Sequence, residues 1–317
     1  MKRLLIIALG LFSTVVQAQG FPDRPLTIIV PAGAGGGGDT TTRLLARGLE
    51  EELGQPITIV NQGQGGGVVG LTSIKNAKPD GYTVGLLFPY AGYHYTGQAD
   101  FSLSDFTPIA NFNGDSSALF TAANSDFDDA SQAVDALRQS PADYTTHCSG
   151  ACGSVWDVPV ASLLLDEGVD VARIRWIPGK GAASGLSELV SGGVDFLTAS
   201  LPEASSMIDA GLVRPLTVLS PEPVDGFTSV PLAGELTGSP VDGGTWRALG
   251  GPKGMPEEAA KVWEEAVLAV TDSEAFKKAM SQAGFGVRPF DAEGLRNLMK
   301  THEEDTARVM RALGYGK

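Results

Sequence analysis

Short β-branched apolar runs alternate with amphipathic stretches along this chain, and the alternation predicts an α/β fold. The run Leu26–Val30 is typical of a buried strand. The stretch that follows it carries leucines at helical spacing, with Asp39 as the predicted N-cap and Gly54 at the end of the helix. The same order then repeats, with a strand at Ile57–Val60 and a helix over Val68–Ala77. The N-terminal part is therefore predicted to consist of strand–loop–helix units.

The pattern continues into a second α/β unit farther along the chain. Residues 106–123 are predicted to be extended, with a crossover between two lobes near Ala118–Ala123, and a helix follows over Ser131–Arg138. The second unit runs from about Tyr144 to Ser220. Its last apolar run, Pro215–Leu219, is interpreted as the strand that returns the chain to the first lobe. The remainder predicts one strand and three helices, with helix starts at Pro256, Ser273 and Asp291.

The first eighteen residues have the three regions of a secretory signal peptide. Lys2 and Arg3 precede an apolar run over residues 4–16, and the small residues before the predicted cleavage point end at Ala18. The run is shorter than the ~20 apolar residues of a spanning helix. The residue directly after the cleavage point is not a cysteine, so lipid anchoring is not expected. We therefore expect a periplasmic protein, exported and cleaved after Ala18, with 317 less 18, or 299, residues in its mature chain.

The charge of the chain narrows its partners. The formal net charge is −14, and removal of Lys2 and Arg3 takes it to −16. So negative a chain is not expected to bind nucleic acid or an anionic membrane surface. An anionic ligand stays possible, because backbone amides in a closed cleft can outweigh a diffuse, salt-screened surface charge. A diffusing monomer with a small-molecule ligand is the interpretation that fits.

The two cysteines lie close together in the chain. Cys148 and Cys152 are separated by Ser149, Gly150 and Ala151. Export favours a local disulfide between them, and two small buried thiols are the alternative. Two cysteines with one neighbouring histidine do not complete a tetrahedral set, so no metal site is predicted.

Glycine-rich loops follow the first two predicted strands. The first loop contains Ala34, Gly35, Gly36, Gly37 and Gly38, and the second contains Gly65, Gly66 and Gly67 before Val68. In an open parallel sheet, ligands bind at the carboxyl ends of the strands, where both loops lie. Glycine lets a ligand approach the amides without a Cβ in the way, and amides at a helix N-terminus favour an anion. The two loops together predict an anion-binding site, with a simple tight turn as the alternative for the first.

With these loops and several further motifs, the chain resembles the Bug family, the TctC-type extracytoplasmic receptors of tripartite tricarboxylate transporters. The likeness extends over essentially the whole mature chain. Its motifs are Phe21–Pro25 leading to Ile29–Pro31 and Gly35–Asp39; Asn61 with Gly65–Gly67; Pro79–Thr83; Gly179–Gly181; Gly193–Asp195; and Thr245–Trp246 with Pro252–Pro256. Each motif alone is weak, whereas their order and spacing together are specific.

The resemblance implies a type II periplasmic-binding-protein fold, in which two α/β lobes enclose a ligand cleft. Residues 19–119 and 222–317 would form domain 1, and residues 120–221 would form the inserted domain 2. It implies a binding protein rather than an enzyme, without a cofactor, that captures a di- or tricarboxylate or an aromatic acid for the permease subunits of a membrane transporter. Backbone groups of residues 34–38 and 64–68 would hold the ligand carboxylate.

Several positions expected at the cleft depart from the family pattern and so leave the ligand open. Tyr90, Tyr93 and Trp156 either form aromatic walls, which would favour a bulkier or aromatic carboxylate, or serve in packing. Lys180 either neutralises a second carboxylate, or is solvated or paired with Asp195. Gly179 stands where the family has a tyrosine, which is expected to leave space. The candidate ligand-binding set also includes Ser149, Ser154 and Pro202.

Three other functions were weighed against transport. A receptor that reports ligand occupancy to a membrane sensor kinase stays open, because the sequence does not separate uptake from signalling. A hydrolase using Cys148 or Cys152 with His147 is disfavoured, since neighbouring residues in extended chain point apart and no acidic orienter is apparent. A nucleotide-binding enzyme is disfavoured because Asn61 stands where the dinucleotide pattern needs an acidic residue.

Overall fold

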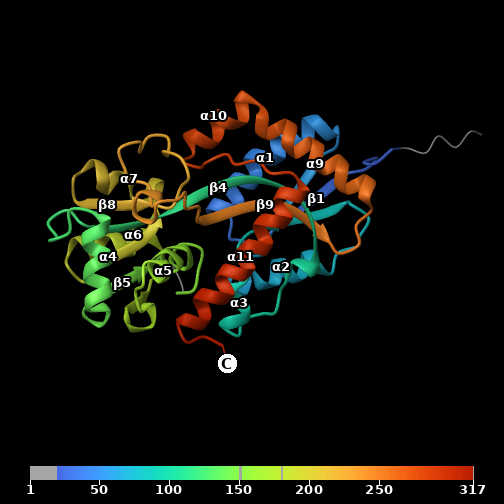
Figure 1. Cartoon of the computed structure of the whole chain (residues 1–317). Coiled ribbons are helices and arrows are strands. Elements are labelled where there is room, and N and C mark those ends of the chain that lie inside the picture. The colour runs from blue at the N-terminus through green and yellow to red at the C-terminus, as the bar shows by residue number, and fades with distance from the viewer. Residues whose placement is uncertain (1–19, 150–151, 180, 317) are drawn as a thin grey trace, which may run out of the picture.

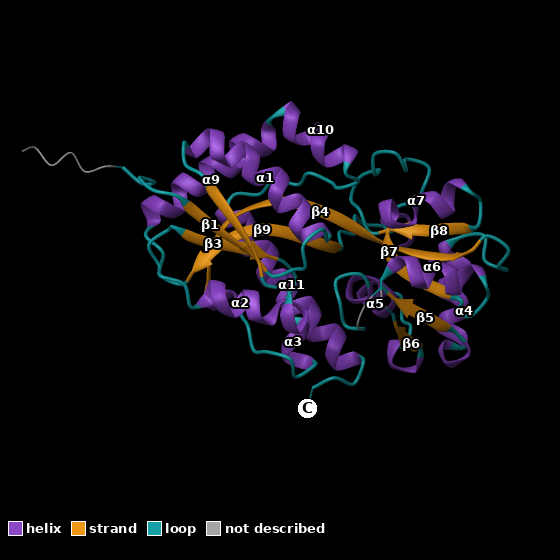
Figure 2. Cartoon of the chain, turned by 180° about the vertical axis from the view of Figure 1, so that it is seen from behind, coloured by secondary structure: helices purple, strands orange, loops and turns teal. Residues whose placement is uncertain are grey.

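A computed structural model describes residues 20–149, 152–179 and 181–316 of the chain. The predicted signal peptide and Lys180 therefore lie outside the described residues. Nine strands form one curled mixed sheet with helices on both faces, and the chain is divided into two α/β lobes (Figures 1 and 2). The predicted α/β class with two lobes is confirmed. No helix in the described ranges has the length and apolar character needed to cross a membrane.

The first lobe contains the parallel strands that the sequence predicted. β1 (Leu26–Val30) lies between β2 (Ile57–Asn61) and β3 (Thr83–Leu87), and it is parallel to both. The antiparallel strand β9 (Gly244–Pro252) pairs with β3 on the other side. Because β1, β2 and β3 run in one direction, the loops that follow them emerge at the same edge of the sheet.

The long strand β4 (Phe106–Ala122) joins the two lobes. Its first part pairs with β9, up to the register pair Ser116–Gly244. Its last part pairs with β7 (Phe196–Ser200) and β8 (Val213–Val218), which lie next to it in Figure 2. Beyond β7 lie β5 (Thr145–Cys148) and β6 (Arg175–Pro178), parallel to each other. The predicted extended segment is thus present, and β4 changes partner between Ser116 and Ser117, just before the predicted crossover at Ala118–Ala123.

The interpretation of Pro215–Leu219 as the returning strand is wrong. Those residues belong largely to β8, which pairs with β4 inside the second lobe. The chain returns later, through β9, which pairs with β4 and β3. An apolar run shows that a strand is buried but not which neighbour it pairs with, and this explains the error.

Eleven α-helices occur in the described part of the chain. They are α1 (Gly37–Leu53), α2 (Val68–Lys75), α3 (Gly92–Tyr95), α4 (Ala130–Gln139), α5 (Asp157–Asp166), α6 (Ala182–Val190), α7 (Leu201–Asp209), α8 (Gly234–Thr237), α9 (Glu257–Asp272), α10 (Glu274–Gln282) and α11 (Ala292–Ala312). Short 3₁₀ turns cover Gln64–Gly67, Leu103–Asp105, Pro141–Asp143 and Val171–Arg173.

The predicted helix starts are mostly confirmed. The side chain of Ser273 accepts from the Phe276 amide at α10, and that of Asp291 accepts from the Gly294 amide at α11. Asp39 is not an N-cap, which corrects the prediction: the N-cap is Gly36, three residues earlier, and α1 begins at Gly37. Glycine has a low helix propensity, so the sequence did not predict that the helix begins inside the glycine run.

The C-terminal helix α11 extends the second lobe's core. It packs on β4, α3 and α5 (Figure 2). Val309 and Met310, both fully buried, belong to the apolar cluster that also contains Val160 and Leu164 of α5. His302, in the middle of α11, lies edge-on to Trp246 with ring centroids 6.1 Å apart.

Candidate functional site

The two glycine loops touch each other at the carboxyl edge of the first lobe's sheet. A Cβ on Gly63 would lie 2.7 Å from the backbone nitrogen of Gly33, so side chains are excluded where the loops meet. Gly67 has φ +99°, and a Cβ there would lie 2.6 Å from the carbonyl oxygen of Pro31. Left-handed backbone and close approach both require glycine at this position.

In the first glycine loop, some backbone amides donate hydrogen bonds within the chain and others have no partner there. The Gly35 amide donates to the carboxylate of Asp39 at 2.8 Å, and the Gly36 amide donates to the Gly33 carbonyl at 3.3 Å. Gly37 and Gly38 are the first residues of α1, and no acceptor within the described chain pairs with their amides. Of the predicted residues 34–38, these two offer helix N-terminal donors.

Asp39 fixes the shape of this loop from the first turn of α1. Its carboxylate also accepts from the Arg43 guanidinium at 2.8 Å and from the side-chain amide of Asn61 at 2.9 Å. Burial by itself raises the pKa of Asp39, but hydrogen bonds from Arg43, Gly35 and Asn61 outweigh it, so the pKa is lowered. The ionised carboxylate therefore ties the first loop to β2.

The second loop is held by its own backbone and by one tyrosine. The Gly67 amide donates to the Gly63 carbonyl at 3.2 Å, and the Val68 amide donates to carbonyls of the same turn. The hydroxyl of Tyr93 donates to the Gly66 carbonyl at 2.5 Å. Gly65 and Gly66 are exposed and left-handed, and their amides have no partner in the described part of the chain. Val68, although predicted to bind ligand, uses its amide internally.

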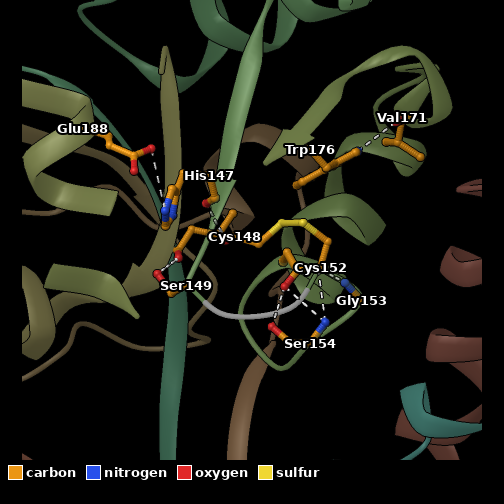
Figure 3. The surroundings of a disulfide bond; sticks show 11 residues. His147, Cys148, Ser149, Cys152, Gly153, Ser154, Val171, Trp176 and Glu188 are labelled. Carbon is orange, nitrogen blue, oxygen red and sulfur yellow. Dashed lines mark hydrogen bonds and ion pairs between the residues drawn. A yellow bond between two sulfur atoms is a disulfide. The ribbon is translucent and has the colours of Figure 1, made fainter. Parts of the chain in front are cut away.

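A disulfide closes the facing loop of the second lobe (Figure 3). It joins Cys148 at the end of β5 to Cys152, the expected pairing, with the two Cα atoms 5.4 Å apart. The Oγ of Ser149 donates to the Thr198 carbonyl at 2.5 Å. The amide and the Oγ of Ser154 donate to Asp157 at 3.1 and 2.6 Å, and the Gly153 amide donates to the same carboxylate. Both candidate serines therefore have intramolecular hydrogen-bond partners.

The three candidate aromatic residues have different surroundings. Tyr90 is 2% exposed and packs against Phe101 and Phe106, and Trp156 is 8% exposed at the start of α5. Tyr93 is half-buried and lines a cavity of about 120 Å³ between α3 and the disulfide loop. Burial raises the pKa of Tyr93 to about 12. Packing accounts for Tyr90 and Trp156, whereas Tyr93 both lines the cavity and holds the second glycine loop.

The remaining second-lobe candidates lie around α6 and α7. Pro202 is half-buried in the first turn of α7, 3.8 Å from where a Cβ of Gly284 would lie. Gly179 does not leave space, contrary to the expectation, because a Cβ there would lie 2.0 Å from Cε1 of His147. The carboxylate of Asp195 accepts from the amide and hydroxyl of Thr145.

Comparison with known proteins identifies the family. The family model described as "Tripartite tricarboxylate transporter family receptor", TctC, matches residues 41–315. The chain belongs to this TctC receptor family. This chain is 28% identical to Protein BugT of Bordetella pertussis over 302 residues, which cover 90% of this chain and 89% of BugT.

Two solved structures share the fold of this chain. A TctC solute-binding protein from Polaromonas, solved with no ligand, has a TM-score of 0.80 at 27% identity, covering 93% of this chain and 99% of that one. MatC from Rhodopseudomonas palustris, solved with bound malate, has a TM-score of 0.68 at 25% identity, covering 92% and 100%. The chain therefore has the fold of periplasmic solute-binding proteins, as the resemblance implied.

The sequence analysis did not single out one charged residue beside the first glycine loop. Arg247 of β9 lies beside the first turn of α1, where its Nη2 would be 3.1 Å from a Cβ on Gly37. Its side chain is 14% exposed and forms an ion pair with Asp115 of β4 at 3.0 Å. The signal was a charged residue inside the otherwise uncharged strand Gly244–Pro252.

Proposed function

We propose that this protein is a periplasmic receptor that binds a small carboxylate between its lobes and delivers it to the permease subunits of a tripartite transporter. The observation that carries the proposal is the pair of unpaired amides at Gly37 and Gly38, at the end of a loop that meets the second glycine loop where Gly63 approaches Gly33. Family membership and the malate bound to MatC support a carboxylate as the ligand class.

The chemistry of the loops suits an anion rather than a neutral ligand. Two amides at the N-terminus of a 17-residue helix present N–H groups and the positive end of its dipole. Asp39 lies in the same turn but engages Gly35, Arg43 and Asn61 instead of these two amides. The arrangement binds and orients a carboxylate, and we assign it no catalytic step.

Ligand binding should close the two lobes. We propose residues 19–119 and the chain from β9 onward as domain 1 and the intervening residues as domain 2, with β4 running through both. The expected boundary at residue 222 is too early, because Val230 and Ala233 still pack in the cores of the second lobe. A ligand that contacts both domains binds the closed form more tightly than the open form, and this difference in affinity drives closure. The closed, monomeric receptor is the form that would dock on the permease.

Thermal unfolding of the mature protein should reveal the ligand. In a panel of aliphatic dicarboxylates, tricarboxylates, amino acids and aromatic acids, at least one carboxylate should stabilise the fold by about 2.7 kcal/mol at a hundred times its dissociation constant. Calorimetry then gives the affinity of each hit. Absence of any carboxylate hit for ligand-stripped protein would contradict the proposal.

A matched variant connects that result to the first glycine loop. Gly36 has φ −75° and is exposed, so Gly36→Val introduces a side chain without left-handed strain. The variant should unfold at a similar temperature while losing at least tenfold in affinity for the identified carboxylate, because the branched side chain blocks access to the neighbouring amides. Unchanged affinity would place the ligand away from this loop.

Tyr93→Phe should weaken binding more modestly. It removes the hydroxyl that donates to the Gly66 carbonyl, a hydrogen bond of about 1 kcal/mol, so the affinity for the identified carboxylate should fall about fivefold. Tyr95→Phe on the same short helix is the matched control and should leave the affinity unchanged. Equal effects of the two variants in calorimetry would show that Tyr93 does not position the loop.

A further inference from the structure

The cavity of about 120 Å³ that Tyr93 lines has walls from both lobes. Residues between 88 and 98 of the first lobe form one side, and residues between 152 and 158 of the second lobe form the other. His302 and Thr306 of α11 complete the lining. A group that fills this cavity therefore contacts both lobes at once.

Three residues of the first-lobe wall also contact the second glycine loop. The Tyr93 hydroxyl donates to the Gly66 carbonyl at 2.5 Å. The side-chain oxygen of Gln98 lies 3.6 Å from where a Cβ of Gly66 would be, and the Phe88 ring lies 3.1 Å from where a Cβ of Gly67 would be. The cavity therefore borders a loop that has two amides without a partner in the described part of the chain. A carboxylate held at this loop could extend a substituent into the cavity.

The walls of the cavity carry no charge at neutral pH. None of the lining residues that the structure describes is an aspartate, glutamate, lysine or arginine. Burial lowers the pKa of His302 to about 4, and it raises the pKa of Tyr93 to about 12, so both rings are neutral. A charged group that entered the cavity would lose its hydration without meeting an opposite charge, whereas an apolar group would gain by leaving water.

The polar groups of the walls already have partners within the chain. The Gln98 side-chain amide donates to the Thr96 hydroxyl at 3.1 Å, and that hydroxyl donates to the Gly92 carbonyl at 3.1 Å. The amide and the Oγ of Ser154 both donate to Asp157. These hydrogen bonds leave the rings and aliphatic groups of the walls as the surface for an occupant.

The volume of the cavity suits a compact apolar group. An engineered apolar cavity of about 150 Å³ stays dry and binds benzene, and this cavity, at about 120 Å³, is slightly smaller. A phenyl ring that is partly inserted, or a branched alkyl group, matches that space. The disulfide to Cys148 fixes Cys152 in the second-lobe wall, so less conformational freedom is lost when the cavity is filled.

We propose that this cavity is a specificity pocket for an uncharged apolar substituent of the ligand, such as a phenyl or branched alkyl group. The receptor would then prefer a carboxylate that carries such a substituent to the same carboxylate without it. This inference rests on the proposed function and names the substrate class of the same cleft. Burial of the substituent between the lobes would add to the closure that the carboxylate drives.

The test compares acids that differ only in the apolar substituent. Acetate is paired with phenylacetate, lactate with 3-phenyllactate, and succinate with phenylsuccinate, and calorimetry on the mature protein gives each affinity. The wild-type protein should bind the substituted acid of at least one pair tenfold or more tightly than its partner. If phenylacetate is that acid, 4-carboxyphenylacetate should lose the gain, because its second carboxylate would enter a cavity without charge.

Val155→Phe fills the cavity from the second lobe. Val155 is half-buried in the loop before α5, and in this variant the ratio of the two affinities should fall below threefold. Val190→Phe is the matched control, since Val190 is half-buried at the end of α6 and does not line the cavity. It should keep the wild-type ratio. Val155→Leu adds a single methylene, and it should lower the ratio partly even if the phenylalanine variant does not fold.

The outcomes separate this inference from the proposed function. If the wild-type protein binds carboxylates but no substituted acid binds more tightly than its partner, the cavity does not select the ligand, although the receptor function stands. The inference is also overturned if both Val155 variants keep the wild-type ratio, or if Val190→Phe lowers it as much as Val155→Phe does. If the wild-type protein binds no carboxylate, the proposed function and the inference fail together.

Discussion

Replacing Gly67 with alanine should lower the free energy of unfolding by about 2–5 kcal/mol and abolish carboxylate binding. The left-handed backbone at φ +99° costs an alanine about 1–2 kcal/mol. Its Cβ would also lie 2.6 Å from the Pro31 carbonyl oxygen and 3.1 Å from the Phe88 ring, and such overpacking costs about 1–3 kcal/mol more. Relief of the clash moves the second loop away from the first. Urea unfolding and calorimetry measure the two effects.

Gly54→Ala is the matched control for this variant. Gly54 is also left-handed, with φ +62°, but a Cβ there meets nothing within 4 Å. The control should cost about 1–2 kcal/mol from the backbone alone and leave binding intact. If the two variants destabilise the protein equally, close packing of the loops contributes nothing to the requirement for glycine.

Asp157→Asn should remove about 3 kcal/mol of pH dependence from the free energy of unfolding. Burial raises the pKa of Asp157 to about 6, against the opposing hydrogen bonds from Ser154 and Gly153. Because the folded pKa is above the ordinary 3.8, this carboxyl stabilises the fold fully below about pH 4, and the contribution is lost as pH rises through about 6. Wild type should therefore lose about 3 kcal/mol relative to the variant between pH 4 and pH 7 in urea titrations.

Ser154→Ala tests the same carboxyl from the other side. It removes a donor that stabilises the ionised form, so its destabilisation relative to wild type should be larger at pH 7 than at pH 4. Parallel pH profiles for wild type and Asp157→Asn would show that Asp157 does not titrate in this range.

Local patterns in the sequence predicted the elements better than their connections. The runs at Leu26–Val30 and Ile57–Val60 are strands of nearly the predicted length, and residues 106–122 form the single long strand β4. Burial on both faces makes β1 readable as an apolar run. The local pattern did not predict that β8 pairs with β4, because strand pairing depends on residues that are distant in the sequence.

The candidate site was predictable where glycine signalled backbone geometry, and less so where side chains decide the chemistry. The two loops meet as expected, yet Val68 and Gly36 use their amides internally. Tyr90 and Tyr93 occur three residues apart in similar sequence surroundings, although one is core and the other lines a cavity. Arg247 escaped notice because its neighbours Asp115 and Gly37 are far away in the chain.

The position of α11 has a consequence for the order of folding. The core of the second lobe includes Val309 and Met310, which lie within ten residues of the chain's last position. Translation supplies these side chains only when the rest of the polypeptide has already been made. The inserted lobe therefore cannot complete its core during synthesis of its own residues, because α11 must be made first. Deletion of α11 should accordingly expose apolar surface on a lobe whose last strand, β8, ends at Val218, well before α11 begins at Ala292.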